Sequence, residues 1–304
     1  MKQLVLSAAV LVTAATQTGC RSAALSLAAD AVAQSGSTYA SDDDPELVRG
    51  AVPFGLKTME GLLAENPRHE ALLTALASGF TQYAYAFVQF DADAADLRGD
   101  LQTARAGRVR AQRLYLRARD YGLRGLDVRR KGFADALRAG GDRARAALAK
   151  AKKGDVPLLY WTAASWALAI SNGKGDMALV AELPVPIEMM ERALALDEAW
   201  GEGAIHEFFI TYDATRSPAE GGGPERAKAH LDRALALSMN KKLGPLVAYA
   251  EGVLVQSQDR AAFTRILEGV LRADAEAVPK YRLVNVLAQR RARLLLDHCD
   301  ELFL

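Results

Sequence analysis

The chain has 304 residues, of which 50% are apolar and 25% charged, with 38 Lys and Arg against 37 Asp and Glu. This composition is typical of an ordinary globular protein and excludes a chain too short or too polar to bury a core; the length allows one large domain or two. Val and Ile are sparse beside Ala, Leu, Arg and Glu, Pro and Gly punctuate the chain at helix-sized intervals, and no strand alternation stands out. We therefore expect an all-α fold.

The N-terminus has the features of an export signal. Met1-Lys2 is a short positive segment, Leu4–Ala15 is apolar but too short to span a bilayer, and the segment ends in small residues at Cys20. This resembles a bacterial lipoprotein signal, although Gln17 stands where an aliphatic residue is usual. The resemblance implies removal of residues 1–19, lipidation of Cys20, and a periplasmic protein anchored to the outer or the inner membrane. An ordinary cleaved signal with an incidental cysteine is the alternative.

Residues 20–40 are rich in small side chains and are interpreted as a tether, followed by a single α-helical domain over residues 41–304. Asp44 before Pro45 predicts a helix start, with the Asp as cap and the Pro at the first helical position. Asp42–Asp44 lacks the spaced oxygens and closing Glu of a calcium loop. Once Cys20 is lipidated, Cys299 is the remaining thiol, so no disulfide forms within the chain; we expect it to be packed and inert.

One short helical unit recurs along the chain, in Met59–Asn66, Met190–Asp197, Leu231–Ser238 and Leu267–Asp274. Each unit predicts a helix end. Small or apolar residues at intervals of four and then three share one helix face and can wedge between neighbouring helices, as in tetratricopeptide repeats. The sets that fit are Ala111, Tyr115, Ala118; Pro186, Met190, Ala193; Ala227, Leu231, Ala234; and Phe263, Leu267, Val270. We expect a tetratricopeptide-like helical-repeat solenoid or bundle, with generic amphipathic helices as the alternative.

Charge is distributed unevenly. Leu97–Lys153 contains 17 Lys and Arg against five Asp, a net charge of +12, which leaves −11 for the rest of the chain. Such a block can meet anionic lipid, an acidic protein face or nucleic acid. Export argues against nucleic acid. A solvated Arg-rich surface is the simpler interpretation.

No catalytic or metal motif is present: HExxH, GxSxG, the P-loop and paired Cys or His at metal spacing are all missing. His206-Glu207 lacks a second His at position 210. The Gly221–Gly223 run before Pro224 could form an anion site but more simply predicts a flexible connector. The sequence predicts no cofactor, no metal and no enzymatic activity.

Several blocks together resemble the TatT family, the T components associated with tripartite ATP-independent periplasmic (TRAP) transporters. These blocks are residues Asp42–Val88, Pro157–Asn172, Ala193–Phe209, Ser217–Ser238 and Tyr281–Leu296. The resemblance implies a lipid-anchored α-helical protein with cryptic tetratricopeptide-like helix pairs, a homotrimer, and a pore or cleft through each subunit. It also implies a periplasmic solute-binding protein (the P component) as partner and a hydrophobic small molecule as ligand.

Aromatic residues are concentrated between Pro157 and Tyr212, which contains all three Trp. Large rings form either a core or the wall of a pocket. Helical spacing places Phe80, Tyr83 and Phe87 on one face, while Tyr85 points elsewhere and is a candidate core residue. The candidate ligand-binding residues are Phe80, Tyr83, Phe87, Tyr160, Trp161, Trp166, Asn172, His206, Phe209 and Tyr212.

Three functions remain open at this point. The first is the T component of a TRAP-type uptake system. The second is a generic envelope scaffold lipoprotein that binds a peptide or a protein. The third, an unrecognised hydrolase, would use His206 or Glu207.

Overall fold

The computed structural model describes residues 29–30, 33 and 36–303. All regular elements in these ranges are helical, which confirms the all-α fold. Residues 1–19 and Cys20 lie outside the described residues. In the part of the chain that is described, no helix combines the length and the apolar character needed to cross a bilayer.

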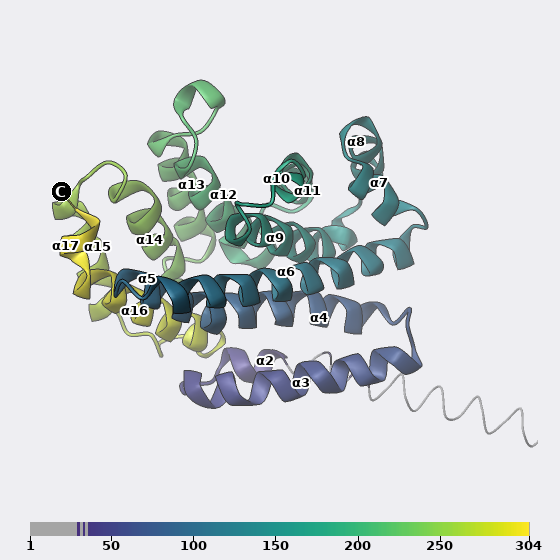
Figure 1. Ribbon diagram of the computed structural model, residues 1–304, viewed down its shortest axis with the longest axis horizontal. Helices are drawn as coiled ribbons and strands as arrows, with labels where there is room; N and C mark the ends of the chain where they lie inside the picture. The colour runs from purple at the N-terminus through teal and green to yellow at the C-terminus, as the bar shows by residue number, and fades with distance from the viewer. Residues whose placement is uncertain (1–28, 31–32, 34–35, 304) are drawn as a thin grey trace, which may run out of the picture.

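The α-helices follow one another with short connections (Figure 1). Their bounds are α2 (Gly36–Ala40), α3 (Pro45–Glu65), α4 (Glu70–Tyr83), α5 (Phe90–Leu97), α6 (Leu101–Arg129), α7 (Phe133–Ala139), α8 (Gly141–Ala149), α9 (Val156–Asn172), α10 (Met177–Val180), α11 (Pro184–Leu196), α12 (Ala204–Ala214), α13 (Pro224–Leu237), α14 (Gly244–Tyr249), α15 (Arg260–Arg272), α16 (Arg282–Asp297) and α17 (Cys299–Leu302). Two π-helical segments, η1 (Ala84–Gln89) and η5 (Ala250–Leu254), continue α4 and α14. The 3₁₀ turns are η2 (Lys153–Asp155), η3 (Trp200–Gly203), η4 (Pro218–Glu220) and η6 (Pro279–Tyr281).

The predicted helix start at Asp44 is confirmed. Its carboxylate accepts hydrogen bonds from the backbone N–H groups of Glu46 and Leu47, at 2.9 and 3.0 Å, and Pro45 opens α3. These bonds satisfy donors that the first helical turn cannot pair internally. Pro224 likewise opens α13 after the glycine run.

Each of the four repeated units ends a helix, as predicted: they close α3, α11, α13 and α15. The four sets of wedge residues are all buried, and Phe263, Leu267 and Val270 are 0% exposed. Burial of one stripe per helix between its neighbours explains why the sets share their spacing.

The longest helix, α6, lies between α4 and α9 (Figure 1). It approaches α9 closely at Gly122, where a side-chain Cβ would come within 3.3 Å of the Cα of Thr162. On its other flank, Phe80 of α4 stacks on Tyr121, with ring centroids 6.0 Å apart. These three helices supply much of the N-terminal core.

The C-terminal half packs α12 on α13, then α14, α15 and α16 in turn. A separate core cluster joins α14, α15 and α16 and includes the buried Cys299, as expected for a packed thiol.

The end of the chain returns to its beginning. Helix α16 contacts α2 and α3 (Figure 1). Arg290 pairs with Glu46 at 2.6 Å, and a guanidinium nitrogen of Arg282 donates to the carbonyl of Ser41 at 3.1 Å. Arg291 pairs with Asp93 of α5 at 3.1 Å. These polar contacts therefore join α16 to the N-terminal helices.

Candidate functional site

Tyr85 marks a recess inside the molecule. The residue belongs to η1 and its surface is 58% exposed. The expectation that Tyr85 is a core residue is therefore wrong. Yet desolvation by the surrounding protein raises the pKa of its hydroxyl well above the usual value, and Glu251, Arg291 and Glu207 act on it electrostatically. Groups of η5, α16 and α12 thus lie close enough to act on a side chain that water reaches, and we infer that these helices form a recess around it.

Tyr160 of α9 belongs to the same recess. Burial raises the pKa of its hydroxyl, and both Glu207 and Tyr85 act on that hydroxyl. Its ring centroid lies 4.9 Å from that of Trp161 and 4.5 Å from that of Trp200, and all three rings are partly exposed. We call the group formed by Tyr85, Tyr160, Trp161, Trp200 and Glu207 the inner recess.

Glu207 of α12 supplies the carboxylate of the inner recess. Burial raises its pKa, and Lys242 acts in the opposite direction. Within the described ranges no hydrogen bond or ion pair reaches this carboxylate, and the same holds for the hydroxyls of Tyr85 and Tyr160. An aromatic wall with a few unpaired polar groups is the usual composition of a small-molecule site.

The charges around the inner recess are, by contrast, paired. Glu202 accepts hydrogen bonds from Lys280 and from the Tyr281 hydroxyl, which keeps its pKa below the usual value. The ammonium of Lys242 donates to the carbonyl of Gly201, and burial lowers its pKa. Both groups therefore already have a protein partner, although Lys242 uses only one of its three N–H donors in that contact.

The two π-helical segments both face this interior. Tyr85 is in η1, and Glu251 in η5 is paired with Arg291. A π turn inserts one extra residue into a helix and so rotates the side chains that follow, which is why such turns are frequent at functional sites. Here they turn side chains of α4–α5 and α14 toward the same space.

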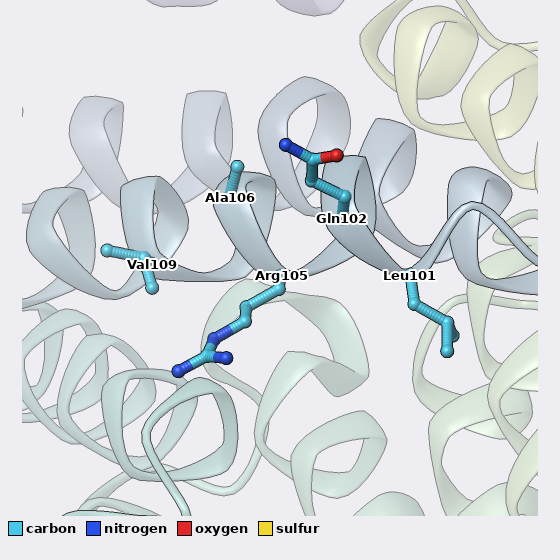
Figure 2. A pocket seen from close by; sticks show the side chains of 5 residues that line it. All are labelled: Leu101, Gln102, Arg105, Ala106 and Val109. Atoms are coloured by element: carbon cyan, nitrogen blue, oxygen red, sulfur yellow. The ribbon is translucent and has the colours of Figure 1, made fainter.

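A second hollow lies on the outside of α6. It is a groove of about 640 Å³ lined by Leu101, Gln102, Arg105, Ala106 and Val109. Figure 2 shows these side chains along the N-terminal half of α6, with Leu101 and Arg105 extending to one side. Leu101 is 68% and Val109 40% exposed, so apolar and cationic groups alternate along this surface.

The basic block spans α6, α7 and α8 and is divided between two roles. Arg129 and Arg130 bind the buried carboxylate of Asp155, and Arg117 pairs with Glu60 at 2.7 Å. The exposed Arg105, Arg110 and Arg113 have no carboxylate within ion-pair distance in the described part of the chain. Arg105 and Arg113 share one side of α6 with Leu101 and Val109, because the four residues are spaced four apart, and we call these four residues the α6 face.

The ten predicted ligand-binding residues do not converge on one place. Tyr160 and Trp161 lie in the inner recess. Phe80, Phe87 and Phe209 are only 3–4% exposed and pack in the core, and Tyr83 packs beside Phe87. Their rings fill space between helices.

The remaining candidates have specific partners. Trp166 is 1% exposed and donates from Nε1 to Glu182 at 2.7 Å. Asn172 donates to Gln89 at 2.9 Å, and Tyr212 lies beneath the guanidinium of Arg216. His206 is buried against His230.

Sequence reasoning missed Trp200 and Tyr85 as site residues and considered Glu207 only for hydrolysis. Trp200 precedes Gly201 and Glu202, which both have positive φ, so its ring position depends on a turn that no periodicity predicts. A usable signal was available at Glu207, an acidic residue that lies between Ile205-His206 and the apolar pair Phe208-Phe209.

Fold and site together define an all-α protein with an aromatic internal recess and a basic outer face. The family model described as TRAP transporter T-component matches residues 41–303, and the chain belongs to that family. An uncharacterized protein of Treponema pallidum (strain Nichols) is 29% identical over 267 residues, which cover 88% of this chain and 82% of that relative. Membership gives the chain a role in a TRAP transport system, in a family of transport components rather than enzymes.

Proposed function

We propose that this protein is a periplasmic lipoprotein that acts as the T component of a TRAP-type uptake system. It holds a hydrophobic small molecule in the inner recess and binds a periplasmic solute-binding protein. The observation that supports ligand binding is that the side chains of Tyr85, Tyr160 and Glu207 are exposed or partly exposed and that their polar groups have no protein partner in the described chain. Rings with a few available polar groups are what a small-molecule site offers to a ligand.

The α6 face is the proposed contact with the solute-binding protein. Its two unpaired arginines, Arg105 and Arg113, attract an acidic surface, and the groove at Leu101 and Val109 accepts an apolar side chain. Salt should weaken this association, because exposed charges are screened over about 8 Å at physiological ionic strength.

The anchor, the assembly and the repeat architecture complete the proposal. Lipidated Cys20 holds the protein at a membrane, and residues 20–40 form the tether. Three copies assemble as a closed homotrimer, in which each subunit uses two different faces. The four repeated helix ends and their buried wedge residues support a tetratricopeptide-like arrangement.

The test is recovery of the mature protein from membrane envelopes, followed by mass spectrometry of the proteins and small molecules that accompany it. We expect a solute-binding protein and an apolar ligand. Arg105→Glu combined with Arg113→Glu should lose the protein partner and keep the ligand. Arg272→Glu, on an exposed residue of α15, is the matched control.

A generic envelope scaffold lipoprotein is the second candidate, favoured by the groove on the α6 face. It predicts that a peptide or a protein unrelated to solute binding accompanies the chain, without a small molecule. If light scattering gives the mass of a monomer at micromolar concentration, the homotrimer is excluded for both candidate functions.

A further inference from the structure

We propose that the inner recess recognises a cationic group on its ligand, an amine or quaternary ammonium attached to an apolar body. Glu207 provides the opposite charge, and the rings of Tyr160, Trp161 and Trp200 provide a cation–π surface. This inference rests on the proposed ligand-binding function and specifies the chemical class of the ligand.

The first observation concerns where the protein places its own cations. A Lys or Arg lies over eight aromatic rings in the described chain, at 4.7–6.0 Å from the ring centroids: Phe80, Phe87, Phe90, Tyr121, Phe133, Trp166, Tyr212 and Tyr281. None of the described cations lies over Tyr160, Trp161 or Trp200. In a chain this rich in arginine, these partly exposed rings are left open for an external cation.

The second observation is the geometry of the ring group. The rings of Trp161 and Trp200 are 6.3 Å apart and inclined at 81°, and Tyr160 contacts both. Rings set at steep angles present faces and edges to one space, which suits a compact, weakly hydrated ammonium group better than a flat ring system.

The third observation is the state of Glu207. The side chain lies against Gly244, where a Cβ would collide with its Oε1, so the start of α14 fixes the position of the carboxylate. Lys242 is the cation that acts on it, but the Lys242 ammonium donates to Gly201 and lies 5.4 Å from the Tyr281 ring centroid. The carboxylate thus keeps its acceptor positions available.

The neighbouring carboxylates differ from Glu207 because each already has a cationic partner. Glu202 is bound by Lys280 and Tyr281, and Glu251 by Arg291. Glu207 is therefore the acidic group of the recess that a ligand cation can neutralise. An anionic ligand would meet this carboxylate, and the nearby cations are engaged: Arg291 is shared by Glu251 and Asp93, and Lys242 donates to Gly201 and acts on Glu207 itself.

The experiment compares three probes with the same eight-carbon chain: octyltrimethylammonium, octan-1-ol and octanoate, each below its micelle-forming concentration. Binding is read from tryptophan fluorescence, since Trp161 and Trp200 lie in the recess while the buried Trp166 provides a constant background. We expect the ammonium probe to bind about tenfold more tightly than octanoate.

Glu207→Gln keeps the shape of the side chain and removes the charge. It should abolish the preference for the ammonium probe while binding of octan-1-ol stays unchanged. Glu65→Gln, on an exposed residue at the end of α3, should keep the preference. Trp200→Leu should weaken the binding of the ammonium probe more than the binding of octan-1-ol.

The outcomes separate the two levels of proposal. If octanoate binds as well as the ammonium probe, or if Glu207→Gln leaves the preference intact, the cation assignment is overturned while bound octan-1-ol still supports an apolar ligand site. If none of the three probes binds, the cation assignment and the proposed ligand binding both fall.

Discussion

Nδ1 of His206 lies 2.8 Å from Nδ1 of His230, where α12 packs on α13. At this distance one nitrogen donates and the other accepts, so the two Nδ1 atoms share one proton. Nε2 of His206 lies 3.1 Å from Glu198, and Nε2 of His230 lies 3.5 Å from Asp213. A fully protonated pair would place two N–H groups face to face and break the contact.

Stability should therefore fall on acidification. Burial lowers the pKa of both imidazoles, so the unfolded chain binds protons at higher pH than the folded protein. The contribution of the pair is present above the unfolded histidine pKa of about 6.5 and is lost as pH falls through that value. Thermal melts should show a lower Tm at about pH 5.5 than at about pH 7.5. Each kcal/mol of unfolding free energy lost on acidification should lower the Tm by about 2–4 °C. His230→Asn should flatten this dependence; equal slopes in both proteins would refute the role of the pair.

Glu207→Gln should raise the Tm at neutral pH. Burial raises the pKa of Glu207, so the stability of the folded state is greatest below the unfolded pKa of about 4.3 and decreases as pH rises through the folded pKa. Glutamine removes the cost of ionising a desolvated carboxyl. The gain should shrink toward pH 4.5 or so, and a variant that melts below the wild type at neutral pH would show that the carboxylate stabilises the fold.

Gly122→Ala should destabilise the contact between α6 and α9. The new Cβ would lie 3.0 Å from Cβ of Thr162 and closer still to its hydroxyl, which forces the helices apart. Overpacking of this kind costs about 1–3 kcal/mol. Gly61→Ala is the matched control, because Gly61 is also inside a helix but has nothing within 4 Å. That variant should gain about 0.5–1 kcal/mol in denaturant unfolding, and equal effects at the two sites would contradict the packing argument.

Arg291→Met should weaken the junction between the two ends of the chain. The change leaves the carboxylates of Asp93 and Glu251 without their shared cation; because these side chains are partly exposed, the loss should be smaller than the about 3–5 kcal/mol of a fully buried pair. Burial raises the pKa of Asp93, so part of the loss should be recovered in mild acid, where that carboxyl protonates. Arg260→Met removes an exposed pair with Asp300 and should destabilise the protein much less than Arg291→Met.

Cys20→Ser should release the protein into the soluble periplasmic fraction, because acyl chains on Cys20 would otherwise hold it at the bilayer. Fractionation of cells followed by immunoblotting measures this directly. A wild-type protein that is already soluble would exclude the lipid anchor.

Much of the local structure could be read from the sequence. The wedge sets such as Phe263, Leu267 and Val270 were predicted from spacing and are fully buried. The cap at Asp44 was predicted from two adjacent residues. These features depend on interactions within a few turns of one helix, so the information lies close together in the chain.

Only the tertiary structure decided which aromatic residues belong to the inner recess. Helical spacing placed Phe80 and Phe87 on one face and both are buried, but a periodic pattern cannot say whether a face meets another helix or an internal space. Phe87 is 3% exposed and Tyr85, two residues away, is 58% exposed, because the opposite sides of η1 face the core and the recess. The contact of Arg291 with Asp93 joins residues 198 positions apart. Such pairs depend on how all the intervening helices pack. Each helix is rotated relative to the one before it, and the combined rotation is determined by the whole fold rather than by any one segment.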